Sequence, residues 1–545
     1  MSSAKWLKAV ALKWFNFKNS NEAVKHKCFS ELTNEENSIL SWLDKNIQDN
    51  KLDYDKQLQM PNPKSFFDEK DKFKDINFAP GMIDSFIGGF DKQDSEKIAK
   101  ELIGLFDKLV DIYEKNEENN ETYRIIDEKL GEIYEFLISH FTKEYANEFI
   151  LLAAKKQDIF VQVLFNTALL LFKKSSHQEA IKFAICITYL GKSDEVIKLL
   201  MTFGLIDNFS NYVAVSLNIS KRQDEIFELA KLSDGYGRIN YITLLEPQSD
   251  NIKKWLIYEG YKNRLGNELC AFECANKGNL LNFINNGWNE ELYDCTADLI
   301  CGLMNDRLDK IYEYGDIKEV LKLFLRRSPK VDMNLSRFSK LCEIFFFLSN
   351  NFNKLGLSEN EKNDLINKIS NIAYNNRYDW KKIIFENVMD YRARIIAKAM
   401  GIDIWDKLFE VAKNDINFDD WSILCDTNNI ENFKAVCELA INRFDLDKIA
   451  TGPADELGLN AEFKQDMDLT MILQKMPYFD EICSIELVKA GLCSRVVVTR
   501  NMALKTVASW KSIPQDILEI IKKNKSKDSS QSTFENYDKI LKNTN

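Results

Sequence analysis

The chain has 545 residues with 20 glycines and eight prolines, and it carries a formal net charge of −11 at pH 7. Average proteins contain about 7% Gly and 5% Pro. The chain therefore has too few turn residues for a β-sandwich, a β-barrel or many βα loops, which predicts an all-α fold. The charge is +5 over residues 1–30 and −13 over residues 31–150, so the remainder is close to neutral. Because nucleic-acid-binding domains show a basic patch or stripe, we expect no nucleic-acid partner.

Residues 1–90 predict an N-terminal basic helix followed by a loosely packed arm. Residues 1–18 place Lys among Trp and other apolar residues at helical spacing. This pattern fits either attachment to an anionic membrane surface or packing on the next element. The stretch lacks the uninterrupted apolar run and the cleavage site of a signal peptide. From Gln48 to Pro80 the helical period fades, and Pro61 and Pro63 interrupt the chain, which indicates a long connection.

Residues 91–142 predict an acidic helical hairpin. Apolar residues recur with a four-three spacing from Ile98 to Ile112, and a second apolar run extends from Ile125 to Phe141 beyond a polar loop. Each run places one apolar seam along one side of a helix. The acidic outer faces fit either a solvated surface or a site for a basic partner.

Residues 143–325 predict a helical repeat array. Short amphipathic helices are expected at 176–190, 193–203, 209–217, 220–232, 252–258 and 269–275. The pattern predicts that Gly191 ends the first in a left-handed conformation, with further stops near Gly204, Gly235, Gly260 and Gly278. Because stacked helical hairpins bury one continuous core that single units could not, the expected architecture is an α-solenoid of the HEAT or armadillo type.

Residues 326–521 predict a second helical repeat segment with a terminal capping repeat. Residues 326–361 indicate a joint, and residues 485–510 form the last strong unit. The β-rich run 495–499 is interpreted as a buried helix start. Residues 522–545 predict a disordered tail with a weak last helix, because 522–533 is polar and low in complexity. Capping boxes, in which Ser or Thr precedes Glu or Gln by three residues, begin at Thr33, Ser176, Ser220 and Ser358.

The cysteines and the hydropathy favour a cytoplasmic protein. Eleven cysteines are scattered through apolar helical segments, which predicts reduced thiols. The most apolar run, residues 159–172, is shorter than the roughly 20 residues that a transmembrane helix needs. We therefore expect no transmembrane segment.

No motif assigns a catalytic, cofactor-binding or metal-binding residue. The three histidines, His26, His140 and His177, lie far apart and lack the spacings of helical di-iron and zinc-protease sites. His177 is expected to be an exposed first-turn residue. Cys270 and Cys274 fit either a two-ligand or redox pair or a core position, and the lack of a second pair favours the core.

Two stretches are similar to bacterial helical-repeat proteins. The first comprises Gly235–Asn240, Leu244–Pro247 and Trp255–Gly260, and it resembles a linker-and-helix unit of these proteins. The second, Thr499–Leu504 followed by Trp510, resembles their last repeat. The similarity covers most of residues 140–512. Some bacterial chains of this kind carry the name limonene hydroxylase.

This resemblance implies a monoterpene oxidoreductase. It would oxidise limonene at an allylic carbon to alcohols such as carveol and perillyl alcohol, and then dehydrogenate these alcohols with NAD(P). Phe345, Phe346 and Phe347 could line a cleft for the small apolar substrate, although such a run is also typical of a core. A hydroxylase needs haem, flavin, copper or non-haem iron to activate O₂, and the sequence contains no motif for any of them. The residues alone favour an alternative, a non-catalytic cytoplasmic α-solenoid scaffold that binds another protein on its concave face.

Overall fold

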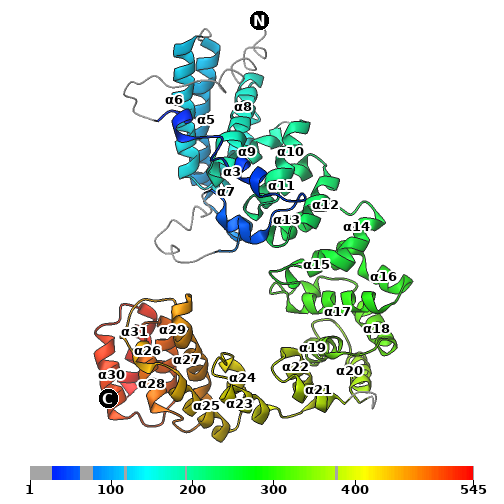
Figure 1. The fold of residues 1–545 in the computed structure, drawn as a ribbon, viewed down its shortest axis with the longest axis vertical. Coiled ribbons are helices and arrows are strands. Elements are labelled where there is room, and N and C mark those ends of the chain that lie inside the picture. The colour runs from blue at the N-terminus through cyan, green and yellow to red at the C-terminus, as the bar shows by residue number, and fades with distance from the viewer. Residues whose placement is uncertain (1–26, 62–77, 116–118, 191–192, 375–378, 544–545) are drawn as a thin grey trace. The chain divides into compact units, whose positions relative to one another are not determined.

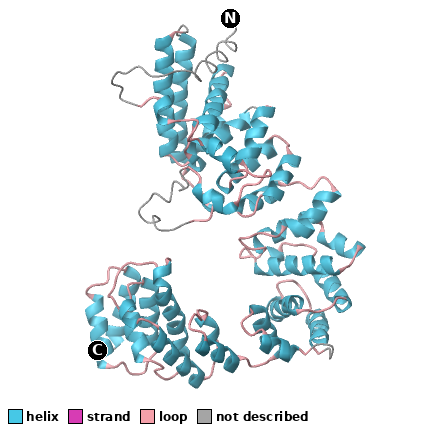
Figure 2. Ribbon diagram, in the orientation of Figure 1, coloured by secondary structure: helices cyan, strands magenta, loops and turns pink. Residues whose placement is uncertain are grey.

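The computed structural model describes residues 27–61, 78–115, 119–190, 193–374 and 379–543. Helices connected by loops make up this part of the chain (Figures 1 and 2), and its β pairing is limited to two isolated bridges, Gln48–Lys51 and Glu456–Val496. The all-α prediction is confirmed, whereas the solenoid arrangement stays a prediction. The chain divides into two compact units, Met1–Asp332 with Phe347–Lys368 and Met333–Phe346 with Ile369–Asn545.

The described parts of the N-terminal arm are well packed. They contain α2 (Phe29–Leu32), α3 (Ile39–Asn46), the 3₁₀ helix η1 (Tyr54–Gln59) and α4 (Met82–Phe86). Side chains such as Phe29, Leu43 and Met60 are buried within the first unit. Figure 1 shows the blue arm lying along the cyan and green helices. The prediction of a loosely packed arm is therefore wrong for these residues. The basic helix predicted at 1–18 and His26 lie outside the described residues.

The predicted helical hairpin is present. It consists of α5 (Lys92–Lys115) and α6 (Asn120–Ser139), and α5 also packs on α7 (Thr142–Ala153) and α8 (Asp158–Lys174). Leu102, Leu109, Ile126 and Leu137 of the predicted seams are fully buried. The four-three spacing thus identified the buried face correctly.

From residue 178 to residue 327 the first unit is a run of short, paired helices. They are α9 (Gln178–Ile187), α10 (Asp194–Phe203), α11 (Asp207–Ile219), α12 (Gln223–Leu232), α13 (Tyr236–Leu244), α14 (Asp250–Trp255), a π-helical turn (Leu256–Gly260), α15 (Glu268–Gly278), α16 (Leu280–Asn286), α17 (Glu290–Asn305) and α18 (Ile317–Arg327). Helix α11 packs on α13, and α15 packs on α17. The sequence did not predict α13, which begins inside the glycine-containing linker, or α16.

Helices end near the predicted glycines, but for a different reason. Gly204 has a right-handed φ of −63°, and a Cβ there would lie 2.8 Å from Leu229 Cδ1. Close packing rather than a left-handed turn thus favours glycine at this position. After Gly278 the left-handed residue is Asn279, with φ of 55°. Gly191 lies outside the described residues.

Of the four predicted capping boxes, only the one at Ser358 forms. Ser358 Oγ accepts from the backbone N of Glu361 at 3.3 Å, and Glu361 Oε2 accepts from the backbone N of Ser358 at 2.8 Å. Thr33 and Ser220 instead follow the last residues of α2 and α11. His177, not Ser176, caps α9. Thr33 donates its hydroxyl to the carbonyl of Phe29. Helix α9 begins one residue later than predicted, so that its cap is His177.

The remaining helices run from the joint region to the C-terminus. They are α19 (Leu335–Asn351), α20 (Glu359–Ala373), α21 (Trp380–Glu386), α22 (Tyr391–Met400), α23 (Trp405–Asn414), α24 (Trp421–Cys425), α25 (Ile430–Arg443), α26 (Leu446–Ile449), α27 (Lys464–Lys475), α28 (Ile485–Leu492), α29 (Val497–Ala508), α30 (Gln515–Lys525) and α31 (Gln531–Asn543). Val496 is fully buried and immediately precedes α29. The β-rich run is therefore a buried helix start, as predicted.

The predicted last helix is present as α31, but residues 522–533 are not the disordered tail that the sequence predicted. Helices α30 and α31 occupy this region, and Asp528 between them forms a fully buried ion pair with Arg500 of α29, with Nε–Oδ2 and Nη2–Oδ1 distances of 2.8 and 2.9 Å. Tyr537 donates to the same carboxylate at 3.2 Å. The prediction was based on the polar composition of residues 522–533, which gives no information on partners such as Arg500 that are distant in sequence.

Two further sequence expectations concern the whole chain. All eleven cysteines are free thiols. None of the helices in the described ranges combines the length and apolarity needed to cross a membrane.

Candidate functional site

The histidines of the described chain have structural partners. The imidazole Nδ1 of His140 lies 2.8 Å from the carbonyl of Phe136 at the end of α6, and its ring stacks on the Phe136 ring. The His177 Nδ1 accepts from the backbone N of Glu179 at 3.3 Å. His177 is half-buried rather than exposed as predicted, because its ring caps α9.

The cysteine pair lies in the core. Cys270 and Cys274 are both buried on α15, and burial raises the pKa of Cys270 to about 12. A thiol with this pKa is a poor ligand and a poor nucleophile near neutral pH. Across the described ranges, no three His, Cys, Asp or Glu side chains are grouped so that they could hold a metal ion.

The three consecutive phenylalanines have different neighbours. The rings of Phe345 and Phe346 lie 5.4 Å apart, while Phe347 stacks on Tyr312 with 6.4 Å between ring centroids. All three side chains are half-buried. These contacts do not bring the three rings together around one cavity.

The turn at Gly235–Gly237 does not fit a dinucleotide phosphate. The carboxyl group of Asp207, the first residue of α11, fills the turn and accepts from the backbone N–H groups of Gly237 and Tyr236. A Cβ on Gly235 would lie 2.4 Å from Asp207 Oδ2 and 2.8 Å from the Tyr54 ring. The donors that would bind a phosphate are thus already bound to an acidic side chain, which would also repel an anion.

Asp207 itself is fully buried beneath the arm. Burial raises its pKa to about 7, although the two backbone N–H groups lower it. Its Oδ2 has no hydrogen-bond partner among the described residues. Gln57 of η1 accepts from the Asp207 backbone N at 2.9 Å. This carboxyl group therefore lies where the arm contacts the helical array.

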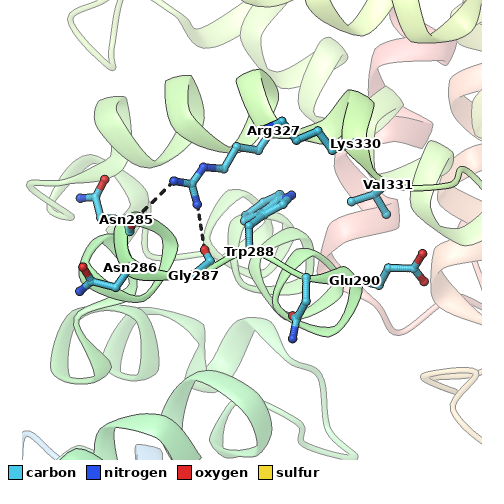
Figure 3. Close-up of a pocket in the computed structure, with 9 residues that line it drawn as sticks. Asn285, Asn286, Gly287, Trp288, Glu290, Arg327, Lys330 and Val331 are labelled. Carbon is cyan, nitrogen blue, oxygen red and sulfur yellow. Dashed lines mark hydrogen bonds between the residues drawn. The ribbon is translucent and has the colours of Figure 1, made fainter.

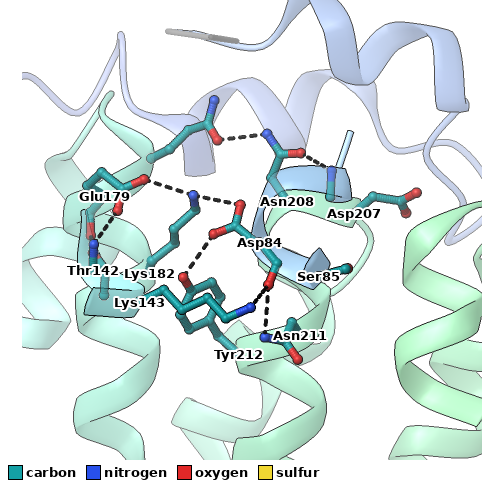
Figure 4. Close-up of polar contacts among 12 residues, drawn as sticks. Asp84, Ser85, Thr142, Lys143, Glu179, Lys182, Asp207, Asn208, Asn211 and Tyr212 are labelled. Atoms are coloured by element: carbon teal, nitrogen blue, oxygen red, sulfur yellow. Dashed lines mark hydrogen bonds and ion pairs between the residues drawn. The ribbon is translucent and has the colours of Figure 1, made fainter. Parts of the chain in front are cut away.

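A second buried polar cluster fixes α4 to the array (Figure 4). The Lys182 ammonium lies 2.8 Å from both Asp84 Oδ2 and Glu179 Oε1, and all three side chains are at most 2% exposed. Burial alone would lower the pKa of Lys182, but the two carboxylates outweigh it and raise this pKa. Tyr212 donates to Asp84 Oδ1 at 2.9 Å, and Thr142 N donates to Glu179 Oε2 at 2.7 Å.

This cluster continues into main-chain contacts with the arm. Lys143 Nζ and Asn211 Nδ2 donate to the carbonyl of Asp84, and Gly81 N donates to Asn208 Oδ1. Each of these polar groups has a partner inside the protein, and the Lys182 side chain is fully buried. The cluster is therefore a structural connection between the arm and helices α7, α9 and α11.

The side chains that could serve a ligand gather instead at the surface, at the C-terminal end of α16. A recess of about 560 Å³ opens there (Figure 3), lined by Asn285, Asn286, Gly287, Trp288, Asn289, Glu290, Arg327, Lys330 and Val331. Arg327, at the end of α18, donates to the carbonyls of Ile284, Asn285 and Gly287. These bonds satisfy the last carbonyls of α16, which lack partners within that helix.

Trp288 forms part of the recess wall and is anchored in the core. The guanidinium carbon of Arg327 lies 5.6 Å from the Trp288 ring centroid, and Figure 3 shows the two side chains side by side. Edge-on contacts with Tyr293 and Phe324, at 5.9 and 6.1 Å, fix the other side of the ring. The half-buried indole is thus a rigid aromatic surface.

A second recess, of about 370 Å³, adjoins the first and shares Asn285 with it. Its lining residues are Leu281, Asn285, Glu319, Lys322, Leu323, Arg326, Glu361, Asp364, Leu365 and Lys368. Lys322 forms ion pairs with Glu319 at 3.2 Å and Glu361 at 3.0 Å. We call the two recesses together the α16–α18 surface.

Two exposed cations of the α16–α18 surface are unpaired. Arg326 borders the second recess and Lys330, in η5 (Ser328–Lys330), borders the first. Neither forms an ion pair with a carboxylate of the described chain. Sequence reasoning missed this site, although residues 285–289, which read Asn-Asn-Gly-Trp-Asn, and the Arg326–Arg327 pair at a helix end were visible.

Comparisons with known proteins identify no relative. No family model matches the chain, and neither a curated protein nor a solved structure matches it. The candidate function therefore depends on the residues and their geometry.

Proposed function

We propose that the protein is a non-catalytic, cytoplasmic helical-repeat scaffold that binds another protein at the α16–α18 surface. One contrast supports this proposal. The buried charged groups at Lys182, Asp207 and Arg500 make internal contacts, whereas the cations of Arg326 and Lys330 are exposed beside two open recesses. Aromatic residues and Arg in rigid surroundings are typical of residues that dominate protein interfaces.

The composition of the surface fits a protein interface better than a site for a small apolar molecule. The first recess has one aromatic and one aliphatic residue, and its other lining residues are three Asn, one Gly and three charged residues. Small-molecule sites are mostly apolar with a few polar groups. Protein interfaces combine buried aromatic anchors with a polar rim.

The experiment is affinity purification of the tagged full-length chain, followed by reconstitution with each purified candidate partner. We expect one partner to bind in calorimetry with a defined stoichiometry. Binding should be lost with Arg326→Glu/Lys330→Glu and kept with the matched variant Lys505→Glu/Lys511→Glu, which changes two exposed lysines elsewhere. Failure of every reconstituted pair to bind would contradict the proposal.

The monoterpene oxidoreductase implied by the resemblance is tested separately. Highly purified protein is incubated with NAD⁺ and carveol or perillyl alcohol, and NADH formation is compared with a mock purification. Turnover that follows the protein through two columns would replace the scaffold proposal with an enzyme. Background turnover, followed by an equally negative test with limonene, O₂ and NAD(P)H, is the outcome that the scaffold proposal predicts.

A further inference from the structure

The charge of the α16–α18 surface points to the chemistry of its partner. The chain as a whole carries −11, yet Arg326 and Lys330 extend into solvent at one end of α18 without a carboxylate partner in the described chain. A third cation, Arg327, lies between them and is committed to the carbonyls of α16. Glu290 is the one carboxylate among the lining residues of the first recess. The three carboxylates of the second recess, Glu319, Glu361 and Asp364, already form ion pairs with Lys322 and Lys368. Carboxylates are the natural partners of exposed Arg and Lys.

The amides of the same surface favour a main chain as the ligand. The side-chain amide of Asn285 forms no hydrogen bond with another described residue, and it stands where the two recesses meet. Asn289 uses its Oδ1 to accept from Leu292 N at 2.7 Å, which leaves its NH₂ group available. A primary amide both donates and accepts. It can therefore pair with the N–H and C=O of an extended peptide, whereas a helix has already paired these groups internally.

Trp288 supplies an apolar contact beside these polar groups. Its ring is held on one side by Tyr293 and Phe324 and flanked by Arg327. An apolar or aromatic side chain of a ligand can pack on such a fixed ring without much loss of conformational freedom on the protein side.

We propose that the partner docks on the α16–α18 surface through an acidic, extended segment. Its carboxylates bind Arg326 and Lys330, its main chain pairs with the amides of Asn285 and Asn289, and one apolar side chain packs on Trp288. This inference rests on the proposed function and adds the chemical class of the partner.

The test measures fluorescence anisotropy of labelled peptides with the full-length chain. The probe is a 12-residue peptide of glutamate and serine with one central phenylalanine, and its control carries lysine in place of every glutamate. We expect the acidic peptide to bind at least about tenfold more tightly than the basic one, since the two charged contacts differ in sign. Removing the phenylalanine should weaken binding by several-fold.

Variants locate the site. Arg326→Glu/Lys330→Glu should weaken binding of the acidic peptide by at least about tenfold, while Lys505→Glu/Lys511→Glu, with the same change in net charge, should stay within about twofold. Asn285→Leu should weaken it by several-fold at constant salt. All four positions of the charge variants are exposed, so unchanged melting temperatures are expected and would show that the fold is intact.

Failure of this inference is distinguishable from failure of the proposed function. Equal binding of acidic and basic peptides, or equal losses in the two charge variants, would overturn the acidic-segment proposal. A partner protein that binds the Arg326→Glu/Lys330→Glu variant as tightly as the wild type would instead rule out the α16–α18 surface as the docking surface, and with it both proposals.

Discussion

Asp207 provides the sharpest prediction, because a single buried carboxyl group should make the stability of the first unit depend on pH. The substitution is Asp207→Asn, which keeps an oxygen acceptor for the N–H groups of Tyr236 and Gly237 and removes the ionisation. In the folded chain the pKa of Asp207 rises from the ordinary 3.8 to about 7 because the group is buried. The folded state therefore holds a proton that the unfolded state has already released between about pH 4 and pH 7.

The difference between the folded and unfolded pKa of Asp207 sets how the free energy of unfolding changes with pH. Because the unfolded state binds fewer protons in this window, stability falls as pH rises from about 4 to about 7 and is then constant. Each pKa unit corresponds to about 1.36 kcal/mol. The increase in the pKa of Asp207 from 3.8 to about 7 therefore lowers the free energy of unfolding by about 4 kcal/mol above pH 7. The first unit has 354 residues, 332 up to Asp332 and 22 from Phe347 to Lys368. With an unfolding entropy of roughly 2.1 cal/mol/K per residue, this free energy corresponds to a melting-temperature difference of about 6 °C.

The assay is thermal melting of both proteins from pH 5 to pH 8. We expect the variant to melt at increasingly higher temperature than the wild type as pH rises, by about 6 °C at pH 8. Asp250→Asn is the matched control, since Asp250 is also the first residue of a helix but its side chain is 99% exposed. A difference between wild type and Asp207→Asn that does not change with pH would refute the reasoning.

Three further predictions test the internal anchors. Lys182→Met leaves two buried carboxylates facing each other and should cost about 3–5 kcal/mol in melting experiments, whereas Lys231→Met, from a surface pair, should cost under about 1 kcal/mol. Arg500→Met should cost about 3–5 kcal/mol and expose the tail to proteolysis, and adding Asp528→Leu should restore most of the loss; no restoration would contradict the buried-pair account. Gly235→Ala should lower the melting temperature because its Cβ meets Asp207 Oδ2 and the Tyr54 ring and because φ is +150° there. The loss should be smaller in an Asp207→Ala background, where the strain and the Tyr54 contact remain, and a larger loss in that background would argue against the Asp207 contact.

Local periodicity predicted the elements whose burial is decided by their own sequence. The seams of α5 and α6 and the start of α29 at Val497 were found because apolar spacing alone specifies the buried face. The prediction failed where the partner is distant in sequence. Residues 522–533 appear polar, but Asp528 pairs with Arg500, 28 residues away. The arm likewise depends on Asp84, whose partner Lys182 is 98 residues away.

The two stretches that carry the resemblance are anchoring points of the fold. Gly235 and Gly237 surround the Asp207 carboxyl group, and Asn240 donates to Ser85 of the arm at 3.2 Å. Arg500 in the second stretch secures the C-terminal helices. The first stretch thus holds the arm and the second holds the C-terminal helices, and these contacts cannot be seen in a single sequence.

The candidate site could not be predicted from the sequence, because it is defined by charged side chains that have no carboxylate partner in the folded chain. The sequence contains many exposed Lys, Arg and Asn residues, and only the structure distinguishes Arg326 and Lys330 from cations with carboxylate partners such as Lys322. The joint predicted at residues 326–361 contains several lining residues of the site, but the prediction did not identify them as a binding surface.

The most direct measurement of the central claim is hydrogen–deuterium exchange of the full-length chain, alone and in complex with its reconstituted partner. The scaffold account predicts that the partner slows exchange in residues 281–290, 319–331 and 361–368, which contain the lining of the α16–α18 surface, and has little effect on α29–α31. Slowed exchange confined to any other region would contradict the proposed docking surface.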